Sequence, residues 1–226
     1  MEQTTVLEVR IGMAMPFGHK NEPSAIIKNA VKGKVWLSKF GLVGDEQADK
    51  VKHGGLDKAL HQYCSDHYKH WQRVVPLAEN LAPGAFGENI VADIHDEANV
   101  CLGDCFRIGG AVVQVSQPRQ PCWKLNVRIN KSDFAKLVQS SGLTGWYYRV
   151  LEAGWISSGD SISLIQRPNP DWTIQNVHRA VYLETAKFDH LKELGTIKEL
   201  SASWKKLILA RLENRSIESW SSRFRD

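Results

Sequence analysis

The segment NVCLGDCFRIGGAVVQVSQPRQPCWKL, residues 99–125, decides the fold class. Its first part predicts two strands, with glycine turns at 102–104 and 109–110. The second strand stops where Pro118 and Pro121 fix φ and remove backbone N–H donors. Short strands with glycine turns recur on both sides of this segment, a pattern that is typical of a β-barrel or a strongly bent sheet.

The loop after the second strand brings a cation and a thiol close together, Arg119 and Cys122. Loops on a rigid scaffold often carry the chemistry of a protein. From the spacing alone, a buried structural cysteine beside a solvated arginine is the simpler interpretation. A functional role for this loop therefore needs support from elsewhere in the chain.

The pattern changes at Arg167-Pro168-Asn169-Pro170, where two prolines in three residues mark a boundary. Beyond it, apolar residues recur at helical spacing in three stretches, the last beginning at Ser201 or Ser203. We therefore predict a mainly β chain with added helices. Residues 1–168 form a β-barrel domain, and residues 169–226 form a small three-helix extension that docks on the barrel or on a partner.

Composition limits the class of protein. The chain has 226 residues and a net charge of +4, with a pI of about 8.8, which is less basic than a typical nucleic-acid-binding face. Four cysteines in a chain of this length imply no disulfide framework. The first ten residues lack the apolar core of a signal peptide, and no run reaches membrane-spanning length. We expect a cytoplasmic protein with reduced thiols and no membrane partner.

Four histidines lie close together in the sequence: His53, His61, His67 and His70. The spacing of apolar residues predicts a helix over residues 59–71, on which His67 and His70 share a face. His61, His67 and His70 could then form a zinc site. Without a paired acidic motif, histidines on an amphipathic helix are the simpler interpretation.

Common catalytic fingerprints are missing from the sequence. It contains no Gly-Lys-Ser/Thr phosphate loop, no G-x-S-x-G elbow and no H-E-x-x-H motif. It also lacks ferredoxin cysteine spacing and a dinucleotide-binding glycine motif. A redox reaction in this chain would therefore need electrons from another protein.

Five motifs in order carry a resemblance: GDEQAD at 44–49, HGGLDKAL at 53–60, FGENI at 86–90, LGD at 102–104 and QVSQPRQPC at 114–122. Together they resemble the MOSC domain, named for the C-terminal domain of molybdenum cofactor sulfurase, and fit its YiiM-like subfamily best. The resemblance implies a MOSC-type β-barrel followed by a three-helix extension. It also implies a molybdenum cofactor, a pterin dithiolene with a phosphate.

In the family, the cysteine at the position of Cys122 is the thiolate ligand of the metal, and His53 or Asp57 is a candidate proton donor. The resemblance offers further residues for the pterin and its phosphate: Arg119, Lys124, Asn89, Glu88, Gly54, Gly55 and Gly87. Pyridoxal phosphate binding is a second prediction at the level of the family.

The resemblance also implies an activity. Related MOSC enzymes reduce N-hydroxylated compounds, and YiiM-like proteins are linked to removal of base analogues such as 6-hydroxylaminopurine. We therefore expect a small N-hydroxylated substrate and a separate flavin or iron–sulfur reductase as electron donor. Three alternatives stay open at this point: a carrier of the cofactor or of sulfur without turnover, a nucleic-acid adaptor using the helical tail, and the zinc enzyme. Self-association into a homo-oligomer is also left open.

Overall fold

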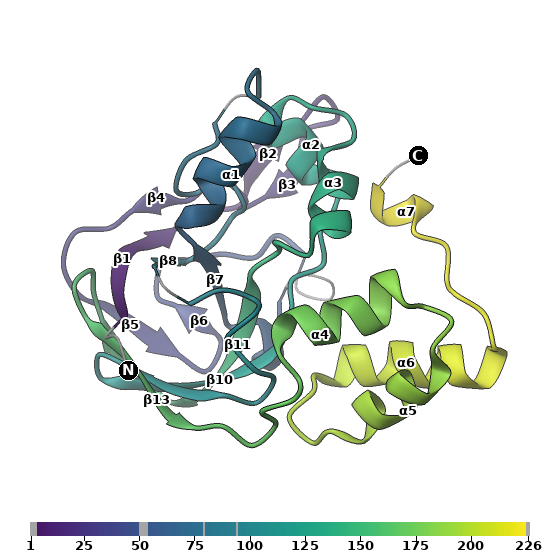
Figure 1. Ribbon diagram of the computed structural model, residues 1–226. Coiled ribbons are helices and arrows are strands. Elements are labelled where there is room, and N and C mark those ends of the chain that lie inside the picture. Colours follow the sequence, from purple (N-terminus) through teal and green to yellow (C-terminus); the bar gives the residue numbers. More distant parts are fainter. Residues whose placement is uncertain (1–3, 50–53, 79, 94, 225–226) are drawn as a thin grey trace.

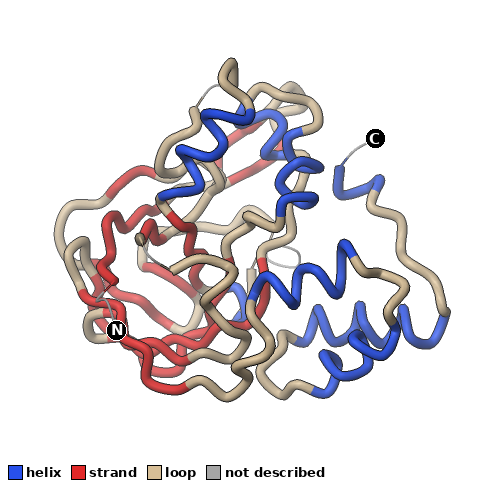
Figure 2. The backbone as a smooth tube through the Cα atoms, in the orientation of Figure 1, coloured by secondary structure: helices blue, strands red, loops and turns tan. Residues whose placement is uncertain are grey.

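The fold is organised around a closed β-barrel. The structure, a computed structural model, describes residues 4–49, 54–78, 80–93 and 95–224. Seven strands follow one another in the order β13-β9-β10-β11-β7-β8-β1, and β13 pairs back with β1 to close the sheet (Figure 2). These strands are β1 (Thr4–Ile11), β7 (Leu60–Cys64), β8 (Ile90–Ala92), β9 (Cys105–Ile108), β10 (Ala111–Pro118), β11 (Trp146–Glu152) and β13 (Ser161–Gln166).

The hairpin of β9 and β10 follows directly from the sequence. Ala111 pairs with Ile108, so Gly109 and Gly110 form a two-residue connection. Gly109 has a φ of 53°, in the region that such tight turns need and that glycine adopts at little cost. The strand β10 is buried along almost its whole length and ends at Pro118. Its two neighbours, β9 and β11, make it a central strand of the barrel.

Smaller strands and several helices are added to the barrel. The strand β4 (Asn29–Ala30) extends the sheet beside β1, and two small sheets lie outside it: β12-β5-β6 and β2-β3. Their bounds are β2 (Met15–Phe17), β3 (Glu22–Ser24), β5 (Val35–Ser38), β6 (Gly41–Leu42) and β12 (Gly154–Ile156). The helices are η1 (Leu56–Lys58), α1 (Asp66–Val74), α2 (Lys124–Ile129), α3 (Phe134–Ser141), α4 (Ile174–His178), η2 (Arg179–Leu183), α5 (Phe188–Thr196), α6 (Ala202–Asn214) and α7 (Ser221–Phe224).

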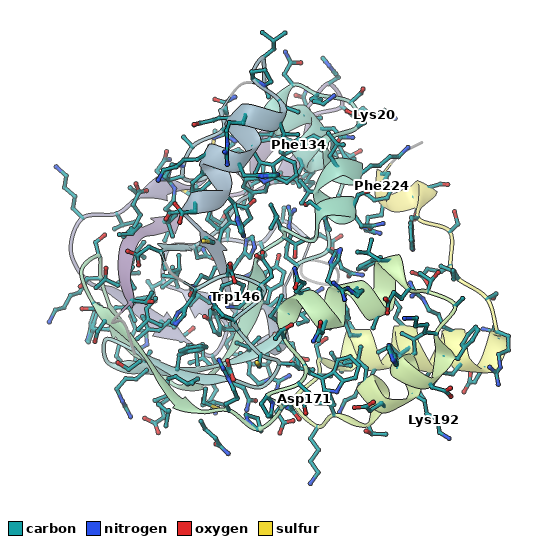
Figure 3. All side chains as sticks on the ribbon, in the orientation of Figure 1. Lys20, Phe134, Trp146, Asp171, Lys192 and Phe224 are labelled. Atoms are coloured by element: carbon teal, nitrogen blue, oxygen red, sulfur yellow. The ribbon has the colours of Figure 1, made fainter. Side chains whose placement is uncertain are left out.

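Three apolar cores hold these layers together. The first fills the barrel and includes Trp146, which lies at its centre in Figure 3. The second lies under α1 and α3 and contains both Phe134 and, from α7, Phe224. The third joins α4, η2, α5 and α6 around Trp204. Figure 1 shows α4 to α6 as one group beside the barrel, while α7 returns to the side of α3.

The predicted fold class is confirmed: a closed barrel followed by C-terminal helices. The start of α6 is also confirmed, because the hydroxyl of Ser201 accepts a hydrogen bond from the Trp204 N–H as an N-cap. Among the described residues, no helix is both long enough and apolar enough to cross a bilayer. The boundary at 168–169 stays a prediction.

The helix predicted over residues 59–71 is wrong in its first half. The chain forms strand β7 there, and α1 begins only at Asp66. Because β7 lies between β11 and β8 and is buried throughout, its apolar residues need not alternate with polar ones. A short buried strand cannot be distinguished from a helical turn by apolar spacing alone.

Candidate active-site cleft

A cleft of about 610 Å³ lies where β7 and β11 meet the loops before β8 and after β10. Its lining includes four cationic side chains, Lys28, Lys58, Arg119 and Lys124. Three carboxylates also line it: Asp45, Glu46 and Asp49. The cleft is therefore polar, with the two signs of charge close together.

The barrel supplies the floor of the cleft through a facing pair on β7 and β11. His61 is paired with Tyr147 in the antiparallel register, and their ring centroids are 4.9 Å apart. The backbone just before β11 passes close to β7. At Gly145, which has a φ of 69°, an added Cβ would lie 2.3 Å from the Gln62 carbonyl oxygen. Only glycine fits this approach, and it lets β11 start directly beside His61.

The imidazole of His61 is neutral at physiological pH. Burial, reinforced by the positive charge of Arg119, lowers the pKa of His61 to about 3. A neutral imidazole offers one donor and one acceptor nitrogen. His61 can therefore orient a ligand by hydrogen bonding but does not act as an acid at neutral pH. Burial also raises the pKa of Tyr147, so its phenol keeps its proton.

The buried side chain of Arg119 lies in the wall of the cleft. Its backbone N–H donates to the Gly145 carbonyl at 3.0 Å, which fixes the chain just after β10. The side chain is 5% exposed, and Nη2 lies 3.5 Å from the Phe86 carbonyl oxygen. Nη1 is buried and has no hydrogen-bond partner among the described residues. A buried guanidinium in this state favours an anionic ligand, because leaving a buried charged donor unpaired is costly.

Cys122 lines the same cleft, two residues before α2 begins. All four cysteines of the chain are described and free, and Cys122 alone is not buried. Burial raises the pKa of Cys64 to about 11, as well as the pKa values of Cys101 and Cys105. The cysteine that the loop was predicted to present is thus the one open to a ligand.

A buried ion pair forms another wall of the cleft. Lys28 contacts Asp45, and the two side chains are only 6% and 2% exposed. Asp45 also accepts hydrogen bonds from the Gly12 N–H at 2.8 Å and from Asn89 Nδ2 at 2.9 Å. Burial lowers the pKa of Lys28, and the charge of Asp45 opposes this shift.

Five of the ten predicted site residues line the cleft: Cys122, Arg119, Lys124, Asn89 and Gly87. Lys124 Nζ donates to the Pro23 carbonyl at 3.0 Å. The Asn89 side-chain amide already makes most of its hydrogen bonds within the protein. Its Nδ2 donates to the Arg10 carbonyl as well as to Asp45, and its Oδ1 accepts from the His61 N–H.

The structure does not bring the other predicted residues to the lining. Glu88 is fully buried and accepts hydrogen bonds from Tyr68 and from two backbone N–H groups of its own loop, so it shapes that loop. Asp57 lies on η1 and binds Arg149. Gly54 and Gly55 precede η1 outside the cleft, and His53 lies outside the described residues.

The zinc alternative finds no support in the geometry. His67 lies on α1, and its Nε2 is hydrogen-bonded to Glu97 Oε2 at 2.6 Å, whereas His61 faces the cleft from β7. Within the part of the chain that the structure describes, no group of three or more His, Cys, Asp or Glu side chains could hold a metal ion. The separation follows from β7, which replaces the first half of the predicted helix.

Sequence reasoning missed several cleft residues: His61 as a cleft residue, Lys28, Asp45, Lys58 and Tyr147. Asp45 and Lys58 do belong to motifs that carried the resemblance, so a signal existed for them. Lys28 follows Ala25-Ile26-Ile27 and is a single charge after an apolar run, a pattern that many surface lysines share. Nothing in the sequence marks Tyr147, because its role depends on the strand register.

The cleft fits the molybdenum cofactor that the resemblance implies. A free thiol is a soft ligand of the type such a metal centre takes. The buried Arg119 Nη1 has no partner among the described residues and suits a pterin phosphate. The same lining adds lysines around one concave space.

Comparison with known proteins identifies the family of the chain. A family model described as the MOSC domain matches residues 49–163, and one described as the YiiM-like 3-alpha helix domain matches residues 172–215. Protein YiiM of Escherichia coli is 41% identical over 205 residues, covering 90% of this chain and 91% of that protein. A protein of Gibberella moniliformis named Reductase is 40% identical over 191 residues, covering 83% of this chain but 34% of the longer protein.

Solved structures show the same architecture. The crystal structure of YiiM from Escherichia coli matches with a TM-score of 0.81 at 33% identity, covering 99% of both chains. YiiM from Geobacillus stearothermophilus matches with a TM-score of 0.79 at 31% identity, covering 92% of this chain and 99% of that one. The chain belongs to the MOSC domain family and carries the helical extension of its YiiM-like members.

Proposed function

We propose that this chain is a molybdenum-cofactor-dependent reductase of N-hydroxylated compounds, acting on base analogues of the 6-hydroxylaminopurine type. The balanced reaction is R–NH–OH plus two electrons and two protons, giving R–NH₂ and water. One observation carries the proposal: the half-buried thiol of Cys122 shares a cleft with the buried guanidinium of Arg119. Membership of the MOSC family and the name Reductase of one relative support an oxidoreductase.

In this proposal each cleft residue has a distinct task. Cys122 is the thiolate ligand, while Arg119 and Lys124 bind the phosphate of the pterin. The bound cofactor would supply the two-electron chemistry at the N–O bond. The neutral imidazole of His61 and the phenol of Tyr147 orient the bound molecules by hydrogen bonding, since both lie on the cleft floor.

Lys28 is the proton donor that the geometry favours. It lines the cleft as a buried ammonium, and burial lowers its pKa, which makes proton release easier. Asp57 does not reach the cleft, because its carboxylate binds Arg149. The imidazole of His61 is uncharged at neutral pH, so it is not an acid that can donate the proton. Lys28, rather than Asp57 of η1, is therefore the proposed proton donor.

Electrons have to come from a partner. The sequence has neither ferredoxin cysteine spacing nor a dinucleotide-binding motif, so a separate flavin or iron–sulfur reductase would deliver two electrons per turnover. A carrier function without turnover is the competing proposal. It shares the cofactor site and differs only in catalysis.

The test begins with metal and pterin content of protein expressed in a molybdenum-replete host. Wild type is compared with Cys122→Ser and with Cys105→Ser, a matched control at a buried cysteine that lies 3.5 Å from the Gly103 carbonyl oxygen. We expect molybdenum and pterin in wild type and in the control, and loss of molybdenum in Cys122→Ser. Equal molybdenum in all three proteins, or stoichiometric zinc without pterin, would overturn the proposed site.

Turnover separates reductase from carrier. Loaded wild-type protein is supplied with electrons from a chemical reductant such as a reduced viologen, and the conversion of 6-hydroxylaminopurine to adenine is followed by chromatography. Conversion that is lost in Cys122→Ser supports the reductase. A loaded protein that converts neither this base nor a simple hydroxylamine would favour the carrier.

A further inference from the structure

The C-terminal residues return to the candidate metal-ligand loop. After α6 the chain turns at Arg215, which has a φ of 51°, and runs back to place α7 beside α3 (Figure 1). Residues 215–224, here called the strap, extend beyond the segment that the helical family model matches, which ends at 215. Phe224 anchors the strap in the same core as Phe134.

Arg223 of the strap brackets Cys122 on both sides. Its Nη1 donates to the Pro121 carbonyl at 2.6 Å, and its own carbonyl accepts the Trp123 N–H at 3.0 Å. Its Nη2 donates to Gln139 on α3. Arg223 therefore connects the residue before the thiol, the residue after it, and the helix behind it.

Aromatic rings hold the guanidinium of Arg223 in place. It lies 4.5 Å from the ring centroid of Phe224 and 5.3 Å from that of Tyr182. Tyr182 also binds the loop directly, because Gln120 Nε2 donates to its hydroxyl at 2.6 Å. A planar cation stacked on rings loses less conformational freedom for each hydrogen bond that it makes.

The strap is itself fixed to α6. Arg211 is 2% exposed and makes two hydrogen bonds to Glu218, at 2.8 and 2.7 Å. Glu218 in turn accepts the Trp220 indole N–H at 2.9 Å. A continuous set of contacts thus runs from the helical extension to the loop at 119–123.

We propose that Arg223 is a positioning residue that fixes the 119–123 loop and so sets the place of the Cys122 thiol in the cleft. On the barrel side, the Arg119 N–H at the start of this loop donates to the Gly145 carbonyl. The strap holds Pro121 and Trp123 through Arg223, and Tyr182 of η2 holds Gln120. The consequence for metal binding rests on the proposed function, whereas the positioning itself does not.

Hydrogen–deuterium exchange of the segment 119–125 tests the positioning in the full-length protein as purified. Arg223→Met keeps the aliphatic bulk but removes the donors, Arg223→Lys restores a charged donor, and Ser222→Ala is a matched control at an exposed residue of the same helix. Losing charge-assisted hydrogen bonds should speed exchange of this segment by about tenfold in Arg223→Met. Arg223→Lys should recover part of the protection, and Ser222→Ala should match wild type.

The readouts distinguish the possible failures. Unchanged exchange at 119–125 in a folded Arg223→Met protein would overturn the proposal, as would equal exchange in the Met and Lys variants, which would indicate packing alone. Should Arg223→Met fail to fold, Glu218→Gln loosens the strap more mildly and must raise exchange in the same segment. Molybdenum content is measured alongside: its absence from wild type refutes the proposed function without touching the exchange result.

Discussion

Breaking the ion pair in the cleft wall should destabilise the fold, and by different amounts at its two ends. We consider Lys28→Met and Asp45→Asn, since both side chains are almost inaccessible. The pair connects the segment before β4 to the loop after β6. Through Asp45 it also holds the Gly12 N–H and the Asn89 amide. Removing one partner of a buried pair leaves the other charge without compensation.

The remaining contacts set the expected magnitudes. After Lys28→Met, the Asp45 carboxylate keeps two neutral donors, so the loss should be about 3 kcal/mol, the lower end of the usual range. After Asp45→Asn, the new amide must turn its NH₂ group toward either the Gly12 N–H or the Asn89 amide. Two N–H donors then face each other, and the buried ammonium of Lys28 no longer has an anionic partner. We expect the free energy of unfolding to fall by about 4 kcal/mol. The double variant should lose about 2 kcal/mol less than the sum of the two single changes.

Urea unfolding of the four proteins, followed by tryptophan fluorescence, completes the double-mutant cycle. Lys69→Met is the matched control, because Lys69 pairs with Asp66 on the surface at 79% and 70% exposure and should change stability little. The reasoning is refuted if the loss of stability in the double variant equals the sum of the two single losses to within about 0.5 kcal/mol. It is equally refuted if Lys28→Met costs no more than the surface control.

Three further changes probe other parts of the structure. Burial alone would lower the pKa of His67, but Glu97 outweighs this effect, and the pKa is raised above its ordinary value of 6.5. The charged form therefore stabilises the fold below pH 6.5, and this contribution is lost as the pH rises through the raised pKa. Urea unfolding should therefore show that His67→Gln costs more at about pH 5.5 than at about pH 9. Ser201→Ala removes an N-cap and should lower the free energy of unfolding by about 1 kcal/mol in the same assay. Asp57→Ala loses its bond to Arg149 and should cost about 1 kcal/mol without changing molybdenum content or turnover; lost turnover at unchanged molybdenum would reinstate Asp57 as a proton donor.

The barrel could be predicted because most of its strands are marked by local sequence signals. Turns rich in glycine and proline located β10, β11 and β13 to within a few residues. The failure at β7 has a physical cause, since a strand buried on both sides needs no alternation. The N-cap at Ser201 likewise depends on local chemistry.

The site was only partly predictable because side-chain direction depends on packing. Glu88 and Asn89 are neighbours in one motif, yet Glu88 turns into its own loop while Asn89 lines the cleft. Asp57 and Lys58 differ in the same way on η1. A motif locates the backbone near a site, but the register of the surrounding strands decides which of its side chains arrives there.

The placement of Cys122 shows why the barrel and the helical extension belong together. From the barrel side, β10 and the Gly145 carbonyl fix the loop at Arg119. From the other side, Arg223 reaches Pro121 across 102 residues of sequence. The barrel contact is made before the thiol, whereas Arg223 holds the residues on both sides of it. In the proposed site, the spacing of Arg119 and Cys122 brings the cation and the thiol near each other, and the contact of Arg223 with the loop sets where the thiol lies.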